Sequence, residues 1–203
     1  MKPEVSIMPK REPRTPLIRE QGHTYEDYAA IPEEAGRYEL LDGELLLLSA
    51  PSTVHQMVST ELQKILYACD EEYLVLNAPL DVILSKHSTL QPDIVMVHRN
   101  RMNMVTIRGI EGPPDLVVEV LSPSTAVRDR GKKQDIYAYY GVPEMWIVDP
   151  ANELLEQYLL KDGHFELEQV YLGDDVVQSP HIPCIQFTMS AVMARIPKLK
   201  ERN

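Results

Sequence analysis

Residues 37–48 form two short apolar runs on either side of an Asp42-Gly43 pair. An Asp-Gly pair in this position is a strong signal for a two-residue β-hairpin turn. The register of such a hairpin places Glu39 and Glu44 on the same face of its strands, because side chains alternate between the two faces along a strand. We expect Glu44, beside the turn, to be exposed and Glu39 to lie deeper.

Farther along the chain, apolar residues recur at helical spacing or gather in short runs. The two long helices are expected over residues 53–68 and 126–140. The expected strands cover residues 73–78, 80–84, 92–97, 115–121, 144–149, 154–160, 164–171 and 185–187. Short helical segments at 24–30 and 190–195 and a loop over 98–112 complete the pattern. The second long helix lies between two strands of buried type, which predicts a right-handed parallel crossover and an α/β or α+β fold with a mixed sheet.

The length of 203 residues suits a single domain with additional terminal segments. The composition, 44% hydrophobic and 25% charged, is that of an ordinary globular domain and excludes collagen, disulfide-rich scaffolds and full disorder. Residues 1–20 contain four prolines and five Lys or Arg, which predicts a flexible N-terminal arm. We therefore expect one domain over 21–197 and a tail over 198–203.

The acidic balance of the chain bears on its partners and its location. A formal net charge of −11 counts against nonspecific coating of nucleic acid but allows an enzyme with a local basic rim. No apolar run approaches the ~20 residues of a membrane span, and the N-terminal segment lacks the apolar core of a secretory signal. Cys69 and Cys184 make neither a disulfide framework nor a zinc pattern. We expect a cytoplasmic protein with no membrane partner.

Two carboxylates lie in unusual contexts, because Asp93 begins an apolar strand and Glu119 lies inside another. An ionised carboxylate buried in this way costs several kcal/mol, roughly, unless it meets a cation. One interpretation is a structural salt bridge with an arginine. The other is a divalent metal ion held by two carboxylates from neighbouring strands.

A candidate cation lies on the helix that follows Glu119. Lys133 shares its helical face with Ile136, Tyr137 and Tyr140, so it lies on or beside the apolar face that packs on the sheet. Either it reaches back over the Glu119 strand, or it packs its stem and extends its ammonium into water. The neighbouring Lys132 points elsewhere and is expected to be solvated.

Several segments of the chain, taken together in their order and spacing, resemble those of one known family. The segments are 37–45, Pro51-Ser52 with His55, 91–95, 114–125, Asp129 with Lys133 and Tyr137, 141–144 and 146–149. They resemble the Uma2 family of the PD-(D/E)XK nuclease superfamily over roughly residues 24–175. The resemblance implies a restriction-endonuclease-like core of helix, three strands, helix and strand. The elements expected above follow in that order: the helix 53–68, the strands 73–78, 92–97 and 115–121, the helix 126–140 and the strand 144–149.

The resemblance also implies a catalytic site. The superfamily's two metal-binding acids fall on Asp93 and Glu119, with the Val120 carbonyl as a third ligand of Mg²⁺, or alternatively Mn²⁺. The residue two positions after Glu119 is Leu121 instead of the usual lysine, and the family's lysine corresponds to Lys133 on the next helix. Glu39 matches a further position that completes the acidic cluster. His55 matches another, and is either a catalytic residue or a packing histidine.

These residue types suit phosphodiester hydrolysis, in which a cation neutralises phosphate and acidifies a water molecule while a lysine stabilises developing charge. The expected partner is nucleic acid, with DNA favoured, and a homodimer would supply two sites for cutting two strands. The basic residues Arg99, Arg101, Arg128, Arg130 and Lys132 flank the proposed site in the sequence, and they either contact the nucleic-acid backbone or form an ordinary solvated rim. The alternative function is a catalytically silent module that binds nucleic acid or protein on the same fold. A serine hydrolase is not supported, because Ser122 lacks a Gly-x-Ser-x-Gly elbow.

Overall fold

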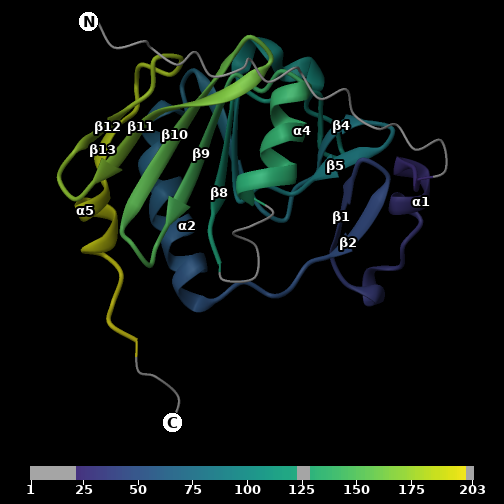
Figure 1. Ribbon diagram of the computed structural model, residues 1–203, viewed down its shortest axis with the longest axis horizontal. Helices are drawn as coiled ribbons and strands as arrows, with labels where there is room; N and C mark the ends of the chain where they lie inside the picture. Colours follow the sequence, from purple (N-terminus) through teal and green to yellow (C-terminus); the bar gives the residue numbers. More distant parts are fainter. Residues whose placement is uncertain (1–21, 123–128, 200–203) are drawn as a thin grey trace, which may run out of the picture.

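The computed structural model describes residues 22–122 and 129–199, in which a six-stranded sheet occupies the centre (Figure 1). Its strand order is β11-β10-β9-β8-β6-β3. The strands are β3 (Tyr73–Asn77), β6 (Ile94–His98), β8 (Leu116–Val120), β9 (Glu144–Asp149), β10 (Leu154–Lys161) and β11 (His164–Leu172). Only the β8–β9 pair of this sheet is parallel, which confirms the predicted crossover and the mixed sheet.

A five-stranded sheet lies beside the central one, in the order β2-β1-β5-β4-β7. Its strands are β1 (Tyr38–Leu41), β2 (Glu44–Leu47), β4 (Val82–Ser85), β5 (Ser88–Leu90) and β7 (Ile110–Glu111). The β1–β2 hairpin has the predicted register, with Glu39 opposite Leu46. Asp42 and Gly43 both have positive φ, 50° and 81°, as a turn of type I′ requires.

The prediction of a loop over residues 98–112 is wrong in part. The segment contains the 3₁₀ helix η3 (Arg99–Met104) and strand β7. Strand β5 was also not expected. Both β5 and β7 are only two or three residues long, so their sequences show no alternation, and they are held by their pairing with β4.

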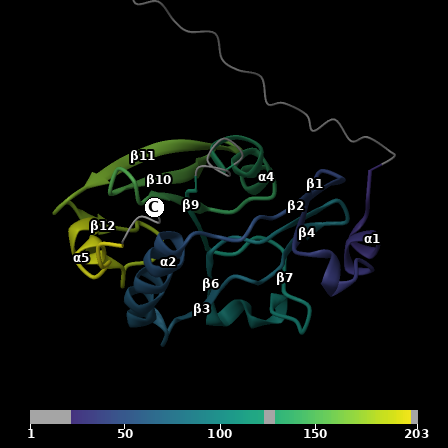
Figure 2. The same cartoon turned by 90° about the horizontal axis from the view of Figure 1, so that it is seen from below.

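Two helices cover opposite faces of the central sheet, as Figures 1 and 2 show together. Helix α2 (Thr53–Leu66) starts at Ser52, whose hydroxyl accepts a hydrogen bond from the amide of His55. Helix α4 (Gln134–Tyr139) packs on the other face and is preceded by a π-helical turn, η4 (Asp129–Lys133). The helix expected over 126–140 is therefore π-helical in its first described turn, and residues 123–128 lie outside the described part.

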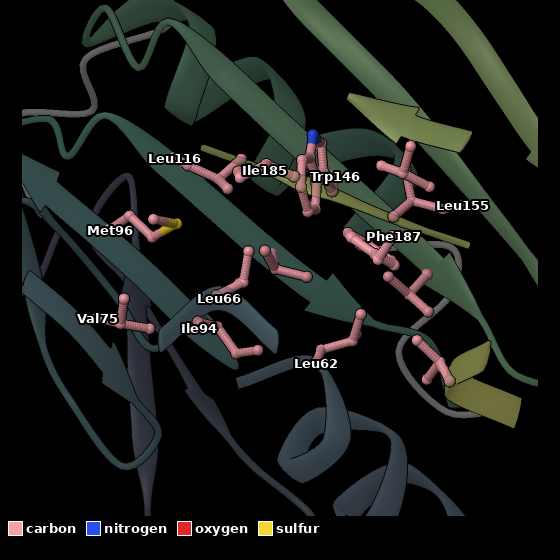
Figure 3. Packing of buried hydrophobic residues seen from close by; sticks show 14 of the residues in the cluster. Leu62, Leu66, Val75, Ile94, Met96, Leu116, Trp146, Leu155, Ile185 and Phe187 are labelled. Carbon is pink, nitrogen blue, oxygen red and sulfur yellow. The ribbon is translucent and has the colours of Figure 1, made fainter. Parts of the chain in front are cut away.

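The alternation of apolar side chains along the central strands produces one core on each face. On the α2 face, Ile94 of β6 packs with a cluster that includes Leu62, Leu66 and Trp146 (Figure 3). On the α4 face, Val95 packs with a second cluster from β8, β9 and the smaller sheet. Val117 of β8 and Leu121, which directly follows this strand, belong to the core on the α4 face. Glu119 lies between them, so the same alternation places it on that face.

The remaining elements lie around the edges of the two large sheets. They are α1 (Tyr25–Ala29), η1 (Glu33–Ala35), η2 (Tyr67–Cys69), β12 (Val176–Gln178), β13 (Gln186–Thr188) and α5 (Met189–Met193). Within the described residues, no helix is long and apolar enough to cross a membrane. The expected arm over 1–20 and most of the expected tail lie outside the described residues.

Cys69 and Cys184 form a disulfide between the end of η2 and the segment that leads into β13. Their sequence separation is 115 residues. The cysteine count and spacing did not predict this pairing, because a contact between distant segments has no local pattern.

Candidate active site

One pocket, with a volume of about 210 Å³, is lined by all five side chains that the sequence analysis selected. These are Glu39, His55, Asp93, Glu119 and Lys133. Glu39 belongs to strand β1 of the hairpin, His55 lies in the first turn of α2, and Asp93 directly precedes β6. Strand β8 and turn η4 supply the last two, so residues far apart in the chain meet at the junction of the two large sheets.

Lys133 lies between two buried carboxylates at this pocket. Its ammonium nitrogen is 2.8 Å from Glu39 Oε1 and 3.0 Å from both carboxylate oxygens of Glu119. The exposed fraction is 0% for Glu39, 3% for Glu119 and 4% for Lys133. Lys133 therefore points back over β8, and the solvated alternative does not apply. Its positive charge lies against both carboxylates and lowers the free-energy cost of burying them.

Two further groups fix the geometry of this cluster. The hydroxyl of Tyr137, one turn along the helix from Lys133, donates a hydrogen bond of 2.9 Å to Glu119 Oε1. The backbone amide of Gln91 donates one of 2.8 Å to Glu39 Oε1. The sequence analysis gave neither residue a role in the site, although the helical spacing of Tyr137 from Lys133 was a usable signal.

Asp93 is held separately, at the wall of the same pocket. Its Oδ1 atom lies 2.9 Å from Nε2 of His55, and its Oδ2 atom accepts a 2.7 Å hydrogen bond from the amide of Val120. The antiparallel pairing of β6 with β8 ends at Ile94 opposite Val118, so Asp93 and Glu119 are the residues that directly follow this last pair at the end of the ladder. The Nδ1 atom of His55 is buried and has no hydrogen-bond partner among the described residues.

The donor atoms at this wall are suited to a hard divalent cation. Each oxygen of Asp93 accepts a single hydrogen bond and so retains a second lone pair, and the side chain is 16% exposed. Asp93, Glu119 and the Val120 carbonyl line one pocket and offer only oxygen, the ligand atom that Mg²⁺ prefers. The described residues contain no group of three or more His, Cys, Asp or Glu arranged to hold a metal ion. Any ion here would therefore complete its coordination with water or substrate oxygens.

The structure favours the alternative of an ordinary rim for these basic residues, because none of the four that it describes lines the pocket. Arg99 donates to the Asp70 carbonyl, Arg101 pairs with Asp115, Arg130 with Glu156, and Lys132 with Glu44 on the surface. Arg128 and the side chain of Asp129 lie outside the described part. The arginine that does line the pocket is Arg37, at the entrance of β1, and nothing in the sequence distinguished it from the others.

Comparison with known proteins agrees with this architecture. A family model named Uma2, described as "Putative restriction endonuclease", matches residues 25–190. The crystal structure of a "putative nuclease belonging to DUF820" from Anabaena variabilis ATCC 29413 superposes with a TM-score of 0.70 at 18% sequence identity. The match covers 84% of this chain and 97% of that one, and it establishes a common fold. No curated protein matches the chain. The family model spans most of the chain, and the protein therefore belongs to the Uma2 family, with a restriction-endonuclease-like fold.

Proposed function

We propose that this protein is a metal-dependent endonuclease that hydrolyses phosphodiester bonds in nucleic acid, with duplex DNA as the favoured substrate. The observation that carries the proposal is the buried Glu39–Lys133–Glu119 cluster in the same pocket as Asp93. A cluster of this kind is expensive to bury, and a protein that only binds has no evident use for it. The Uma2 family and the shared fold support the same class of activity.

Each residue has a distinct task in this proposal. Asp93, Glu119 and the Val120 carbonyl would hold Mg²⁺ or Mn²⁺, and the bound ion supplies charge neutralisation and a more acidic water molecule. His55 orients Asp93 through its Nε2 contact, while Glu39 and Tyr137 keep Lys133 and Glu119 in place. The Lys133 ammonium provides a fixed positive charge beside the reacting phosphate, where negative charge increases during the reaction.

The proposal extends to the assembly and the location of the protein. The described part of one chain forms a single pocket with this set of residues, so cutting both strands of a duplex calls for a homodimer. The sequence predicts a cytoplasmic location, where both DNA and Mg²⁺ are available, whereas the Cys69–Cys184 disulfide is more typical of an oxidising compartment. Size-exclusion chromatography with light scattering, with and without duplex DNA, tests the dimer.

The activity is tested with supercoiled plasmid and single-stranded RNA in Mg²⁺ or Mn²⁺, with EDTA as the blank. We expect nicking or linearisation of the plasmid that is lost in Asp93→Asn, which preserves the shape of the side chain. Lys133→Met should lower turnover by roughly 10²–10³-fold, the usual effect of removing one electrostatic stabiliser. Lys132→Met is the matched control, since Lys132 lies beside Lys133 but pairs with Glu44 at the surface.

The outcomes separate the proposal from its alternative. Lys133→Met leaves two buried acids without their cation, so its folding is checked first by circular dichroism, and Asp93→Asn stands as the independent variant. Metal-dependent cleavage abolished by Asp93→Asn supports the enzyme. Binding of DNA by the wild type without turnover in either metal overturns the enzyme in favour of a silent binding module.

A further inference from the structure

We propose that Arg37 is the residue that binds a phosphate group of the substrate backbone, and that Gln91 aims it at the pocket. This inference rests on the proposed function for the nature of its ligand. It adds a binding residue at the entrance of the site, separate from the groups that would carry out hydrolysis.

The position of Arg37 places a positive charge at the mouth of the pocket. Arg37 is exposed and directly precedes β1, and its carbonyl accepts a hydrogen bond from the amide of Leu48 across the open end of the hairpin. Arg37 and Leu48 both line the pocket, and Arg37 is exposed whereas Glu39, two residues further along the chain, is fully buried.

The guanidinium is oriented by a neutral acceptor instead of a carboxylate. Its Nε and one terminal nitrogen donate to Oε1 of Gln91, over 3.2 and 2.8 Å. Within residues 22–122 and 129–199, Arg37 makes no ion pair, unlike Arg101 and Arg130. Its charge is therefore not cancelled, and three of about five N–H donors of a guanidinium remain for a ligand.

Gln91 can act as a rigid support because both ends of its amide are fixed. Its Nε2 atom donates to Asp81 Oδ1 over 2.9 Å and to the hydroxyl of Tyr28 over 3.0 Å, so Oε1 must face Arg37. The Tyr28 hydroxyl also donates to Asp81 over 2.7 Å. Burial, together with this contact, raises the pKa of the Tyr28 phenol, which keeps it protonated as a donor. The orientation of the Gln91 amide is thus set by a carboxylate on one side and a guanidinium on the other.

Charge balance explains why the site needs this arginine. The pocket holds the carboxylates of Glu39, Asp93 and Glu119, and Lys133 already contacts two of them. With a divalent ion bound as proposed, that ion and Lys133 together would only balance the three carboxylates, so a further cation is needed to give the pocket a net positive charge toward a polyanionic substrate. Arg37 is the other Lys or Arg among the described residues that line the pocket, and a guanidinium matches the geometry of a phosphate.

The test measures binding, so it does not depend on catalysis. Fluorescence anisotropy of a labelled duplex DNA is recorded at several salt concentrations, in Ca²⁺ and again in EDTA. Arg37→Ala should raise Kd about tenfold and reduce the slope of log K against log salt by about one, as the loss of one phosphate contact does. Arg195→Ala removes the same charge from an exposed arginine outside the pocket and should bind like the wild type.

The role of Gln91 is tested separately from that of Arg37. Gln91→Met keeps the length of the side chain and the backbone amide that contacts Glu39, and it should raise Kd about threefold through the loss of the two hydrogen bonds that orient the guanidinium. In an Arg37→Ala background the same change should have no further effect, because Gln91 acts through Arg37. An additive effect would overturn the positioning role.

The outcomes distinguish this inference from the proposed activity. Wild-type affinity and salt slope in Arg37→Ala would overturn the inference and leave the nuclease proposal standing. DNA binding that depends on Arg37, in a protein that never cleaves, would overturn the nuclease and support the inference. No binding of duplex DNA by the wild type in either buffer would overturn the phosphate contact.

Discussion

Glu119 lies inside an apolar strand, and its charge is balanced within the protein. Lys133 contacts both of its carboxylate oxygens, and the hydroxyl of Tyr137 donates to one of them. Removing one partner from such a buried group costs more than the pair contributes, because the remaining group stays desolvated. At the scale of single residues, the site is thus sensitive to changes that preserve volume but delete a donor.

Tyr137→Phe tests this sensitivity with a minimal change. Tyr137 is fully buried, so the variant keeps the packing of the ring and removes the hydroxyl that donates to Glu119. We expect a loss of about 1.5–3 kcal/mol in the free energy of unfolding, the usual range for a hydrogen bond to a charged group. Urea denaturation measures it.

Tyr139→Phe is the matched control, because Tyr139 lies on the same helix and is 57% exposed. It should unfold like the wild type. Equal stability of the two variants would show that the Tyr137 hydroxyl does not support Glu119.

At the scale of elements, turn η4 is attached on both sides by ion pairs at the surface. Arg130 forms a two-point contact with Glu156 of β10 and lies 3.8 Å from Asp149, while Lys132 pairs with Glu44 of β2. Each exposed pair contributes little by itself. Together they connect the turn to both large sheets, and Lys133 lies between the two attachments.

Asp149, in the turn between β9 and β10, is expected to make a pH-dependent contribution to the free energy of unfolding. Burial alone would raise the pKa of the Asp149 carboxyl, but hydrogen bonds from Asn152 and Ala151, with Arg130 nearby, bring this pKa below its ordinary value. A folded-state pKa below the unfolded one contributes stability above the unfolded pKa, and that stability is lost as the pH falls through the folded pKa.

Asp149→Ala should therefore cost about 1–2 kcal/mol at neutral pH, and the difference from the wild type should shrink toward roughly pH 2. Urea denaturation across this range measures both proteins. Glu71→Ala is the control, since Glu71 is exposed and its side chain makes no hydrogen bond or ion pair with the described residues. A difference that stays constant with pH would exclude the ionised carboxylate as its source.

At the scale of the whole molecule, the disulfide connects the α2 side of the central sheet to the C-terminal elements. Cys69 follows α2, and Cys184 precedes β13, whose Phe187 belongs to the core on the α2 face. A bridge across 115 residues restricts the unfolded chain strongly. The C-terminal elements are thus attached both by the core and by a covalent bond.

Reduction should lower the thermal stability of the protein. We expect a loss of about 2–5 kcal/mol, seen as a lower Tm in dithiothreitol than in its absence. A Cys69→Ser/Cys184→Ser double variant should show one Tm in both conditions. Two titratable thiols in unfolded protein prepared without reductant would contradict the bridge.

Local patterns were enough to predict much of the fold. The Asp42-Gly43 pair fixed the hairpin register, because a two-residue turn allows only one pairing of its strands. Alternation along β8 predicted the face of Glu119, and helical spacing predicted the face of Lys133. The π-helical turn did not change the face of Lys133, because the regular helix α4 begins directly after this residue. The short strands β5, β7 and β12 escaped prediction, since two or three residues show no period.

The sequence by itself determined the order of helices and strands along the chain and the residue types available for the site, since both depend on patterns within short segments. The tertiary structure decided which cations are near that site. Arg37 reaches Gln91 across 54 positions, and Cys69 reaches Cys184 across 115, whereas Arg101 and Arg130 are taken up by acids elsewhere. Such contacts form when separate elements pack together. They leave no periodic pattern within a segment, so they can be identified only in the folded structure.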